Sequence, residues 1–411
     1  MKQNMNHPLQ IIGLHPGSLK APQEALETIA KADVLSGGKR LLAAFPKFKG
    51  KKIPFASGME EYARTLEKLL NKGKKVVLLA DGDPLLFGIA KSIIPLLGEK
   101  NVKITPALSA IQIGASRLGR SWKDSEIISL HGRNDFSPLF GAMQRRKDCA
   151  IYTDNINTPQ VIARRLSDKG IDNYTFTVLS DLETPDEVVA QGRPESFLNY
   201  KCSDLNIIIL TADNKDHSTP VFGRSDDEFI REKGLITKFP VRAAGIALLD
   251  LREKHTLWDL GAGCGSVAIE ASFLASDSRV FAVEKNSARV RMIEENIRNL
   301  RAWSVEAVSG DMPSILAELP EPDRIFMGGG IGHDDSALRD AAERLKPGGR
   351  IVIHAILMGS IQRTRELFDE LGWNWQSMQI QASTSDKLAG DVRYKAYNPV
   401  TILWADKPEG K

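Results

Sequence analysis

Apolar runs of strand length alternate with stretches of helical period along the whole chain. Residues 9–14 and 76–80 are largely apolar runs of the length of buried strands. Residues 21–32 and 85–97 instead repeat apolar positions three and four apart, which is typical of amphipathic helices. This rhythm predicts the α/β class, with largely parallel sheets covered by helices.

A polar stretch without periodicity, residues 213–220, follows an apolar strand predicted at 206–210. Such stretches between periodic regions are typical of linkers. The length of 411 residues also exceeds what one core usually fills. We therefore expect one domain over residues 1–213, a linker over 214–225 and a second domain over 226–411.

The first domain is expected to form two lobes. A turn at residues 105–110 and a strand-like run at 127–130 begin a second α/β pattern inside it. The lobes then span about residues 1–106 and 107–213, with a cleft between them.

The net charge and the cysteine content argue against nucleic-acid binding, a cysteine metal site and a disulfide framework. The 55 Lys and Arg residues against 52 Asp and Glu give a formal net charge of +3, far from the basic character of nucleic-acid-binding domains. The three cysteines form no CxxC pair, so neither a metal site nor a disulfide framework is expected. A polar start and apolar runs too short to span a bilayer predict a cytoplasmic enzyme without nucleic-acid or membrane partners.

The second domain contains a glycine-rich turn after an apolar strand. Residues 256–260 are followed by three glycines at alternate positions, Gly261, Gly263 and Gly265. Such glycines let a ligand approach the backbone at the start of a helix. Asp259 before the turn and Glu284 at the end of the next strand offer carboxylates to an amino group and a ribose diol, respectively. A carboxylate at this place would repel a pyrophosphate.

Two later strand ends extend this pattern. Asp311 and Met312 follow the run 305–308, where a carboxylate can accept a hydrogen bond from an adenine amine. Gly328 follows a further strand, where a substrate and the cofactor can meet. Helix capping or turn formation is the alternative for Asp259 and Asp311, and a solvated strand end is the alternative for Glu284.

Loops at three predicted strand ends and the turn at residues 105–110 indicate another site in the first domain. Together they contain the candidate residues Gly13, Gly17, Gly82, Asp83, Ser109, His131 and Arg133. Open α/β sheets bind ligands at the carboxyl ends of their strands, so these loops are expected to face one crevice. Asp83 as a helix cap and His131 as a structural side chain are the alternatives.

The first domain resembles the cobalamin-pathway branch of the tetrapyrrole (corrin/porphyrin) methyltransferases. The shared motifs are the GxxPG loop at 13–17, the GDP loop at 82–84, and residues 106–110, 129–133 and 157–159. One departure is His15, where members usually have glycine, and this puts in doubt how closely the loop approaches substrate.

The second domain resembles the decarboxylating precorrin methyltransferases at residues 226–229, 236–238 and 395–400. Fused in this order, the two domains resemble the family of precorrin-6Y C5,15-methyltransferases (decarboxylating). The resemblance implies a two-lobed tetrapyrrole methyltransferase fold followed by a Rossmann-like class I methyltransferase fold. It also implies a homo-oligomer.

The resemblance implies methylation of carbons 5 and 15 of a precorrin, with or without cobalt, and loss of carbon dioxide from the ring C acetate. It implies two S-adenosylmethionine sites per chain, with Thr237 in the second. Carbon 15 and the decarboxylation are assigned to the second domain, and carbon 5 to the first. The substrate has many carboxylates, for which the candidate partners are Arg133, Lys238, His354, Arg393 and Lys395. Each of these can equally be an ordinary surface residue.

Two rival functions are open at this point. One domain can have lost catalysis and only bind the tetrapyrrole, although both halves have glycine loops. A nicotinamide-dependent reductase is the other, because a glycine-rich turn alone does not distinguish the two cofactors.

Overall fold

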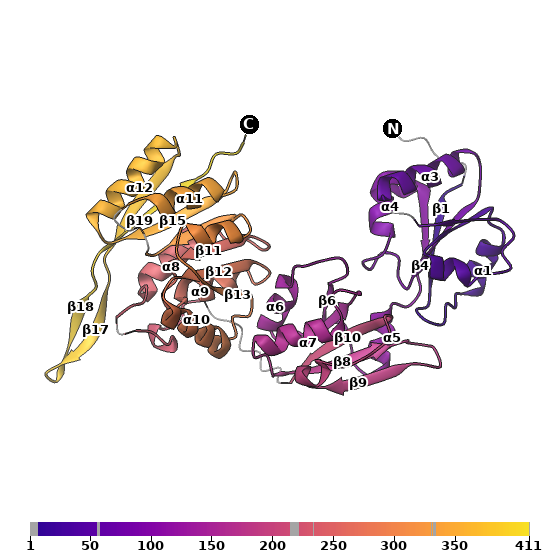
Figure 1. Cartoon of the computed structure of the whole chain (residues 1–411), viewed down its shortest axis with the longest axis horizontal. Coiled ribbons are helices and arrows are strands. Elements are labelled where there is room, and N and C mark those ends of the chain that lie inside the picture. The colour runs from indigo at the N-terminus through magenta and orange to yellow at the C-terminus, as the bar shows by residue number, and fades with distance from the viewer. Residues whose placement is uncertain are drawn as a thin grey trace. The chain divides into compact units, whose positions relative to one another are not determined.

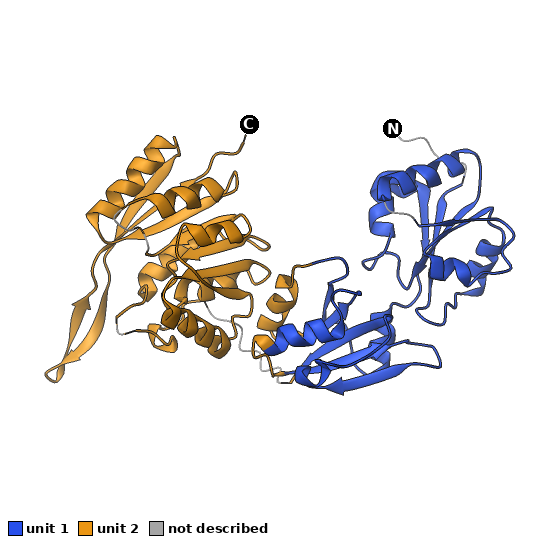
Figure 2. Ribbon diagram, viewed as in Figure 1, with its two compact units in different colours: residues 1–133, 148–167, 174–211 blue, residues 134–147, 168–173, 212–411 orange. Residues whose placement is uncertain are grey.

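The chain, described by a computed structural model, forms two compact units (Figure 2). Unit 1 comprises residues 1–133, 148–167 and 174–211, and unit 2 comprises residues 134–147, 168–173 and 212–411. The structure describes residues 7–55, 58–213, 222–232, 234–329, 331 and 334–410. Most of the predicted linker, residues 214–221, therefore lies outside the described residues.

The first sheet of unit 1 has five parallel strands in the order β3-β2-β4-β1-β5 (Figure 1). They are β1 (Leu9–Leu14), β2 (Val34–Gly37), β3 (Lys51–Pro54), β4 (Val76–Asp81) and β5 (Val102–Thr105). The connecting helices are α1 (Gln23–Ala30), α2 (Lys39–Ala43), α3 (Met59–Asn71) and α4 (Ala90–Leu97), with the 3₁₀ turn η1 (Glu99–Asn101). Since β1 pairs with β4 in parallel, the loops after both strands lie at the same edge.

The helix predicted from residue 85 begins only at Ala90, so that prediction was wrong for residues 85–89. Asp83 accepts a hydrogen bond from the backbone N of Leu85 at 2.9 Å, which forms a turn. Phe87 has φ +54°, in the left-handed region, and a residue in that conformation cannot continue an α-helix.

The second sheet of unit 1 has the order β6-β7-β10-β8-β9 and mixes parallel with antiparallel pairs. Its strands are β6 (Glu126–Ser129), β7 (Cys149–Tyr152), β8 (Tyr174–Ser180), β9 (Val188–Gly192) and β10 (Asn206–Ala212). They are accompanied by α5 (Ala110–Arg117), α7 (Pro159–Asp168) and η2 (Pro194–Phe197).

Unit 2 is built on one seven-stranded sheet in the order β13-β12-β11-β14-β15-β19-β16. Five of its strands are parallel, and β19 runs antiparallel to both of its neighbours. The strands are β11 (Thr256–Leu260), β12 (Arg279–Glu284), β13 (Val305–Ser309), β14 (Arg324–Met327), β15 (Arg350–Ala355), β16 (Trp375–Ile380) and β19 (Val400–Asp406). The hairpin β17 (Ser383–Leu388) and β18 (Asp391–Ala396) forms a separate two-stranded sheet.

Helices and short turns surround this sheet. They are α6 (Ser137–Gln144), α8 (Phe239–Leu248), α9 (Ser266–Leu274), α10 (Ser287–Leu300), α11 (Ser336–Arg344) and α12 (Met358–Glu370), with η3 (Asp226–Glu228) and η4 (Ser314–Glu318). Trp258, Phe326 and Phe368 are among its largest fully buried side chains. Within the described residues, no helix is both long enough and apolar enough to cross a membrane.

The α/β class and the Rossmann-like arrangement of the second half are thus confirmed. The strand order of unit 2 reverses around β11, because β12 pairs with one of its edges and β14 with the other. In open α/β sheets the ligand lies at such a switch point, beside the carboxyl ends of the strands. The glycine-rich turn follows β11 and therefore lies at this point.

Candidate cofactor and substrate sites

The turn after β11 has a conformation that requires glycine. Three of its residues have positive φ, with values of +71°, +60° and +78° for Gly261, Gly263 and Gly265. Backbone N–H groups of Gly261 and Ala262 both donate to the carbonyl of Val283, at 3.0 Å, and so fix the turn to β12. A Cβ on Gly261 would lie 2.9 Å from the carbonyl oxygen of Gly329, so a side chain there would displace the neighbouring loop.

Two buried carboxylates flank this turn. Asp259 Oδ2 accepts a hydrogen bond from the backbone N of Ala268 at 2.9 Å. Glu284 accepts one from Gly263 and one from Asn286, both at 3.0 Å. Burial, and secondarily the charge of Glu284, raise the pKa of Asp259 to about 7. Neither carboxylate forms an ion pair with any residue that the structure describes, so a cation bound here would stabilise both.

A cavity of about 570 Å³ opens beside these carboxylates. This volume is typical of sites for nucleoside-sized ligands. The predicted residues among its lining are Thr237, Lys238, Asp259, Gly261, Gly263, Glu284, Gly328 and His354. Glu232, Leu235, Ile236, Arg289, Tyr397 and Asn398 also line it, and the sequence analysis did not single these out as site residues. Only the fold shows that the segment before α8 and the first turn of α10 border the same space.

The cavity fits a nucleoside that carries an amino-acid group better than it fits a dinucleotide. An α-ammonium group would supply the missing partner for Asp259, and ribose hydroxyls can donate to the remaining lone pairs of Glu284. A pyrophosphate beside two buried carboxylates would be repelled at these distances. The two carboxylates therefore agree with a bound nucleoside that carries a sulfonium group and an amino-acid group.

His354, at the end of β15, is buried within this lining. Burial lowers its pKa to about 3, so the imidazole is neutral near pH 7. It cannot supply the positive charge that motivated its selection from the sequence. Its ring lies 4.6 Å from that of Phe326, and neither ring nitrogen has a hydrogen-bond partner among the described residues. An unsatisfied neutral imidazole can still hydrogen-bond a ligand if the surrounding side chains move.

The remaining predicted residues of the second half lie at the edge of this cavity or away from it. Lys238 Nζ lies 3.5 Å from Asp226 and 5.8 Å from the centre of the Tyr397 ring. Arg393 and Lys395 are exposed on β18, where Arg393 pairs with Asp386 at 3.3 Å. Gly265 begins α9. Asp311 is exposed and Met312 is partly buried, and neither lines the cavity.

An exposed apolar edge lies next to the cavity. Ile356 lines the cavity mouth and is 63% exposed, and the next two residues, Leu357 and Met358, are 69% and 79% exposed. We call these three residues the apolar shelf. Such contiguous exposed apolar side chains are typical of binding surfaces.

The predicted residues of the first half gather around the carboxyl ends of β1 and β4. A Cβ on Gly13 would lie 2.0 Å from the carbonyl oxygen of Gly82, and a Cβ on Gly82 would lie 3.0 Å from the Cα of Ser109. Gly17 has φ +73°, and a Cβ on it would lie 2.0 Å from the carbonyl oxygen of Leu182 in the second lobe. These contacts require glycine at all three positions and place the loops of both lobes together.

Side chains from β6 and β7 complete this cluster. Ser109 forms a capping box at the start of α5 and hydrogen-bonds Tyr152. Burial raises the pKa of Tyr152 to about 12, with a smaller contribution from Asp83. The Tyr152 ring contacts Phe87, over which the Arg133 guanidinium lies at 5.9 Å. Tyr152 was not identified from the sequence, because only the fold brings β7 to this site.

Two histidines of the first half have defined partners. His15 Nδ1 lies 3.0 Å from Glu183 Oε2, which also accepts a hydrogen bond from Ser18. The departure at position 15 thus fastens the loop to the second lobe. His131 Nδ1 lies 3.3 Å from the carbonyl oxygen of Thr153.

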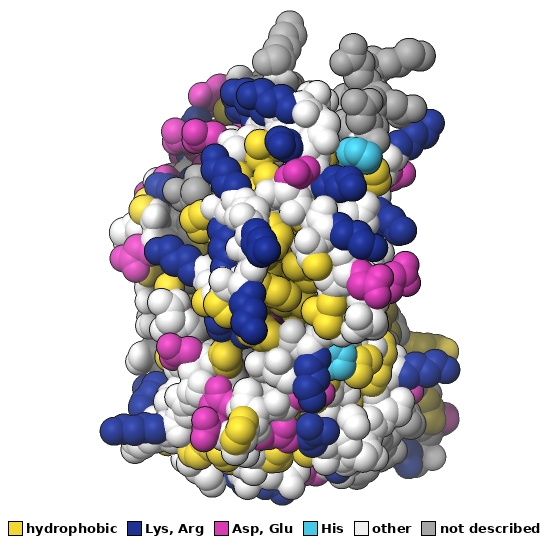
Figure 3. Space-filling model, turned by 90° about the vertical axis from the view of Figure 1, so that its right-hand side faces the viewer, with side chains coloured by type: hydrophobic (Ala, Val, Ile, Leu, Met, Phe, Trp, Pro, Cys, Tyr) yellow, Lys and Arg dark blue, Asp and Glu magenta, His cyan; other side chains and the backbone are white. Residues whose placement is uncertain are grey.

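Figure 3 shows many Lys and Arg side chains around an apolar area on the face nearest the viewer, where unit 1 lies. The first lobe contributes to this character. Its residues 1–106 include 15 Lys and 2 Arg against 3 Asp and 6 Glu. This excess of positive charge attracts acidic ligands, although the whole chain is nearly neutral.

Two family models of known proteins match the chain. Residues 8–197 match the family model of tetrapyrrole (corrin/porphyrin) methylases, and residues 228–407 match a precorrin methyltransferase domain. A precorrin-6Y C(5,15)-methyltransferase (decarboxylating) from Sinorhizobium sp is 30% identical over 397 residues, which cover 96% of this chain and 95% of the relative.

Two shorter proteins are also similar. A cobalt-precorrin-6B C(15)-methyltransferase (decarboxylating) from Salmonella typhimurium is 31% identical over 186 residues, covering 45% of this chain and 96% of the relative. A crystal structure of precorrin-6y C5,15-methyltransferase from Geobacter metallireducens aligns with a TM-score of 0.44 and 35% identity, over 46% of this chain and 100% of that chain.

Proposed function

The chain belongs to the family of precorrin-6Y C5,15-methyltransferases (decarboxylating), and from this premise we propose how its two halves divide the reaction. The chain is an S-adenosylmethionine-dependent methyltransferase that acts on a precorrin. The second half transfers a methyl group to carbon 15 and removes the ring C acetate carboxyl group. The first half transfers a methyl group to carbon 5. A relative of about the length of the second half is named for the carbon-15 step, which supports this assignment.

Two donor sites per chain follow from this division. The observation that supports the second-half site most strongly is the pair of buried carboxylates, Asp259 and Glu284, without a cationic partner among the described residues. Gly261, Gly263 and Gly265 shape the turn between them, and Thr237 and Gly328 border the same cavity. Asp311 and Met312 are proposed to contact adenine, since the neighbouring Gly310 N donates to the backbone carbonyl of Glu284.

The first-half donor site is proposed at Gly13, Gly17, Gly82, Asp83 and Ser109. The close approach of these loops at the carboxyl ends of β1 and β4 supports it. His131 and Arg133 lie beside the same loops and are proposed to orient the macrocycle.

When bound, S-adenosylmethionine supplies an electrophilic methyl group on a positively charged sulfur. The chain's own residues need mainly to align this group with a nucleophilic ring carbon and to exclude water. Asp259 and Glu284 hold the two polar ends of the donor, and the apolar lining around Phe326 keeps solvent out. No strong base is needed for this step.

The surroundings of the reacting acetate determine the decarboxylation. Loss of carbon dioxide leaves an electron pair that the conjugated macrocycle accepts, and a proton then replaces the carboxyl group. A neutral His354 near this position leaves the carboxylate poorly solvated, which favours loss of its charge. Lys238, which lines the cavity, and Arg393 and Lys395, which are exposed on β18, are proposed to bind other carboxylates of the substrate. The apolar shelf is proposed to contact the face of the macrocycle.

Mass spectrometry of the product tests this function directly. After incubation with S-adenosylmethionine and precorrin-6Y, or its cobalt form, we expect two added methyl groups and one lost carboxyl group. Calorimetry with S-adenosylhomocysteine is expected to give two equivalents per chain, which also excludes a half that only binds the tetrapyrrole. Binding of NADH in the same cavity would instead support the reductase. We also propose a cytoplasmic homo-oligomer on the strength of the family, and sedimentation measurements test the assembly.

A further inference from the structure

Part of the wall of the second-half cavity is an irregular segment that needs support from elsewhere. We call residues 224–232 and 234–238 the wall segment, and these described residues contain no regular element other than the short turn η3 before α8 begins. Leu235, Ile236, Thr237 and Lys238 from this segment line the cavity. Ile230 is fixed to α10 by two hydrogen bonds with the side chain of Asn296, both at 2.8 Å, so the residues on either side of it need further contacts to hold their position.

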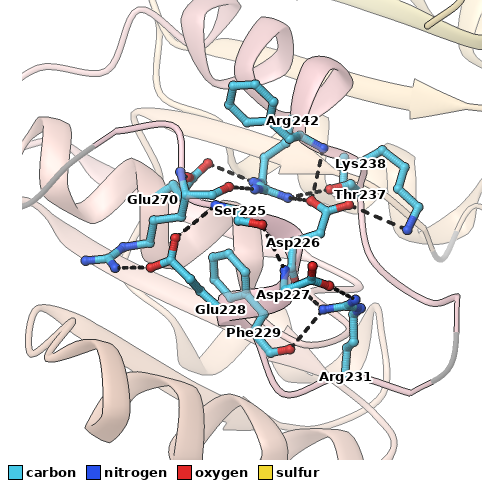
Figure 4. Close-up of polar contacts among 12 residues, drawn as sticks. Ser225, Asp226, Asp227, Glu228, Phe229, Arg231, Thr237, Lys238, Arg242 and Glu270 are labelled. Carbon is cyan, nitrogen blue, oxygen red and sulfur yellow. Dashed lines mark hydrogen bonds and ion pairs between the residues drawn. The ribbon is translucent and has the colours of Figure 1, made fainter. Parts of the chain in front are cut away.

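Arg242, in the first turns of α8, binds this segment at both ends (Figure 4). Its Nη1 donates to the carbonyl of Thr237 at 2.6 Å and to Asp226 Oδ1 at 2.9 Å. Its Nη2 donates to the carbonyl of Arg224 at 2.6 Å. One guanidinium thus joins the beginning, the turn and the end of the wall segment, and its side chain is 0% exposed.

A further contact of Arg242 leads to the helix that follows the glycine-rich turn. Its Nε donates to Glu270 Oε2 at 2.7 Å, and Glu270 is also 0% exposed. The other oxygen of Glu270 accepts hydrogen bonds from the backbone N of Gly223, at 3.1 Å, and of Arg224. Glu270 belongs to α9, the buried helix that starts directly after Gly265. The network therefore connects two parts of the cavity wall, the wall segment and the helix after the turn.

A buried ion pair is a poor device for stability alone. Two apolar side chains of similar volume would stabilise the packing of α8 against α9 as well or better, because desolvating two charges is costly. Such pairs instead fix one arrangement, because each removed partner leaves an unsatisfied charge. Here the arrangement that is fixed is the position of Thr237 and Lys238 at the cavity.

We propose that Arg242 is a positioning residue of the second-half donor site, which holds the wall segment against α9 and thereby sets the affinity for the methyl donor. This inference depends on the proposed function, since it assumes that the cavity binds S-adenosylmethionine. Asp226 links Arg242 to Lys238. Its Oδ1 binds Arg242, and its Oδ2 lies 3.5 Å from Lys238 Nζ, so it also helps to position Lys238.

The variant Arg242→Lys in the full chain tests the proposal. Lysine keeps the charge but cannot form the fork of contacts to Thr237, Asp226 and Glu270. We expect the KM for S-adenosylmethionine in carbon-15 methylation to rise about tenfold, because a charge-assisted hydrogen bond contributes roughly that factor, while kcat at saturating donor stays within about twofold. The affinity for S-adenosylhomocysteine should fall in parallel. Carbon-5 methylation by the same molecules should not change, and it serves as the internal control for folding.

A second variant keeps the test decisive if Arg242→Lys does not fold. Asp226→Asn retains an oxygen for Arg242 and leaves the pair of Arg242 with Glu270 intact, and we expect a rise in the donor KM of roughly threefold. The matched control is Asp227→Asn, because Asp227 is the next residue, is exposed and pairs only with Arg231 among the ion pairs of the described residues. Its donor KM should equal that of the unaltered chain.

The proposal is overturned if both Arg242→Lys and Asp226→Asn fold and bind S-adenosylhomocysteine as the unaltered chain does. It is also overturned if the variants lose kcat alone, or lose the carbon-5 activity to the same extent, since either result indicates general destabilisation. An unaltered chain that binds no S-adenosylhomocysteine in the second half would count against the proposed function instead.

Discussion

At the scale of single residues, the two acids at the glycine turn differ in how well their charges are supported. Glu284 accepts two backbone hydrogen bonds, whereas Asp259 accepts one and is completely desolvated. Burial raises the pKa of Asp259 to about 7, so a cationic ligand bound beside it would favour the ionised form of this carboxyl group.

The raised pKa of Asp259 predicts that the affinity for the methyl donor depends on pH. The folded pKa of Asp259 lies above its unfolded value, so without ligand this group favours folding at low pH and loses that contribution as the pH rises towards 7. The donor ammonium needs the ionised form. Affinity for S-adenosylhomocysteine in the second half should therefore be full above pH 7, and should fall towards tenfold per pH unit below it.

Calorimetry from about pH 5.5 to about pH 8.5, a range that brackets the pKa of Asp259, measures this dependence. Buffers of different ionisation enthalpy reveal the proton released on binding. Asp259→Asn should bind more weakly and lose the dependence. Equal dissociation constants at both ends of the range in the unaltered chain would contradict the assignment.

Gly13 provides a residue-scale prediction for the first half. A Cβ at this position would lie 2.0 Å from the carbonyl oxygen of Gly82 and 2.8 Å from the backbone N of Ala107, so Gly13→Ala must move backbone rather than a side chain. We expect it to lower the free energy of unfolding of the first half by about 2 kcal/mol and to abolish carbon-5 methylation. The control Gly38→Ala meets no atom within 4 Å. Urea unfolding and product analysis of both variants check this.

The sequence allowed prediction of which residues of a local motif lie close together. Gly261, Asp259 and Glu284 belong to one strand-turn-strand pattern, and the structure places them at one cavity. Arg242 and Glu270 were not predicted, because their partnership spans two helices. Their signal was a single charged residue within each of two apolar helical stretches. The charge of His354 could not be predicted either, since its protonation depends on burial.

At the scale of elements, the start of α12 combines two unusual features. Its first residue, Met358, and its N-cap, Leu357, are apolar and highly exposed, and no side chain caps the helix. The exposed backbone N–H groups of a first turn favour anions. An apolar surface beside such N–H groups suits an apolar macrocycle with carboxylates at its periphery.

We therefore expect Leu357→Ser combined with Met358→Ser to weaken binding of the precorrin to the second half about tenfold. Donor affinity should remain unchanged, because neither residue lines the cavity. Leu371→Ser is the matched control, since Leu371 is a leucine 41% exposed at the other end of the same helix. Fluorescence or absorbance titration with the tetrapyrrole measures the effect. Unchanged affinity in the double variant would remove the apolar shelf from the substrate site.

Strand positions were predicted more closely than helix starts. The runs at 9–14 and 76–80 correspond to β1 and β4, because largely apolar runs of this length are typical of strands buried within a sheet. The helix expected from residue 85 starts five residues later, because the turn at Asp83 and the left-handed Phe87 depend on local backbone geometry that apolar periodicity does not express. The hairpin of β17 and β18 has mostly exposed residues and therefore no burial pattern to reveal it.

At the scale of the whole molecule, the compact units do not follow the order of the chain. Helix α6 and residues 168–173 precede the expected boundary at 213 but belong to unit 2. Seven of the eight residues of α6 are buried. The side chain of Gln144 donates a hydrogen bond to the carbonyl of Ser272 at 2.9 Å. Ser304 in turn donates to Gln144, at 3.1 Å. A boundary read from composition cannot reveal such a contact, because it depends on tertiary packing.

This packing affects how the two halves behave when they are expressed separately. A fragment of residues 222–411 keeps the seven-stranded sheet and the cavity but loses α6, whose buried Leu139, Phe140 and Met143 lie in unit 2. Loss of this apolar contact and of the Gln144 hydrogen bonds should lower its melting temperature by at least about 5 °C relative to unit 2 in the full chain. Gln144→Ala in the full chain should reproduce a smaller part of this decrease.

The same fragments test the division of the chemistry. Because Asp259, Glu284 and the whole cavity lining lie between residues 232 and 400, the fragment 222–411 should bind S-adenosylhomocysteine and release carbon dioxide from a precorrin already methylated at carbon 5. The fragment 1–213 should methylate carbon 5 only, and with α6 exposed it should aggregate more readily than the full chain. Release of carbon dioxide by the fragment 1–213 would reverse the assignment. Inactivity of both fragments, with activity restored on mixing them, would mean instead that α6 must be in place for the second-half site to work.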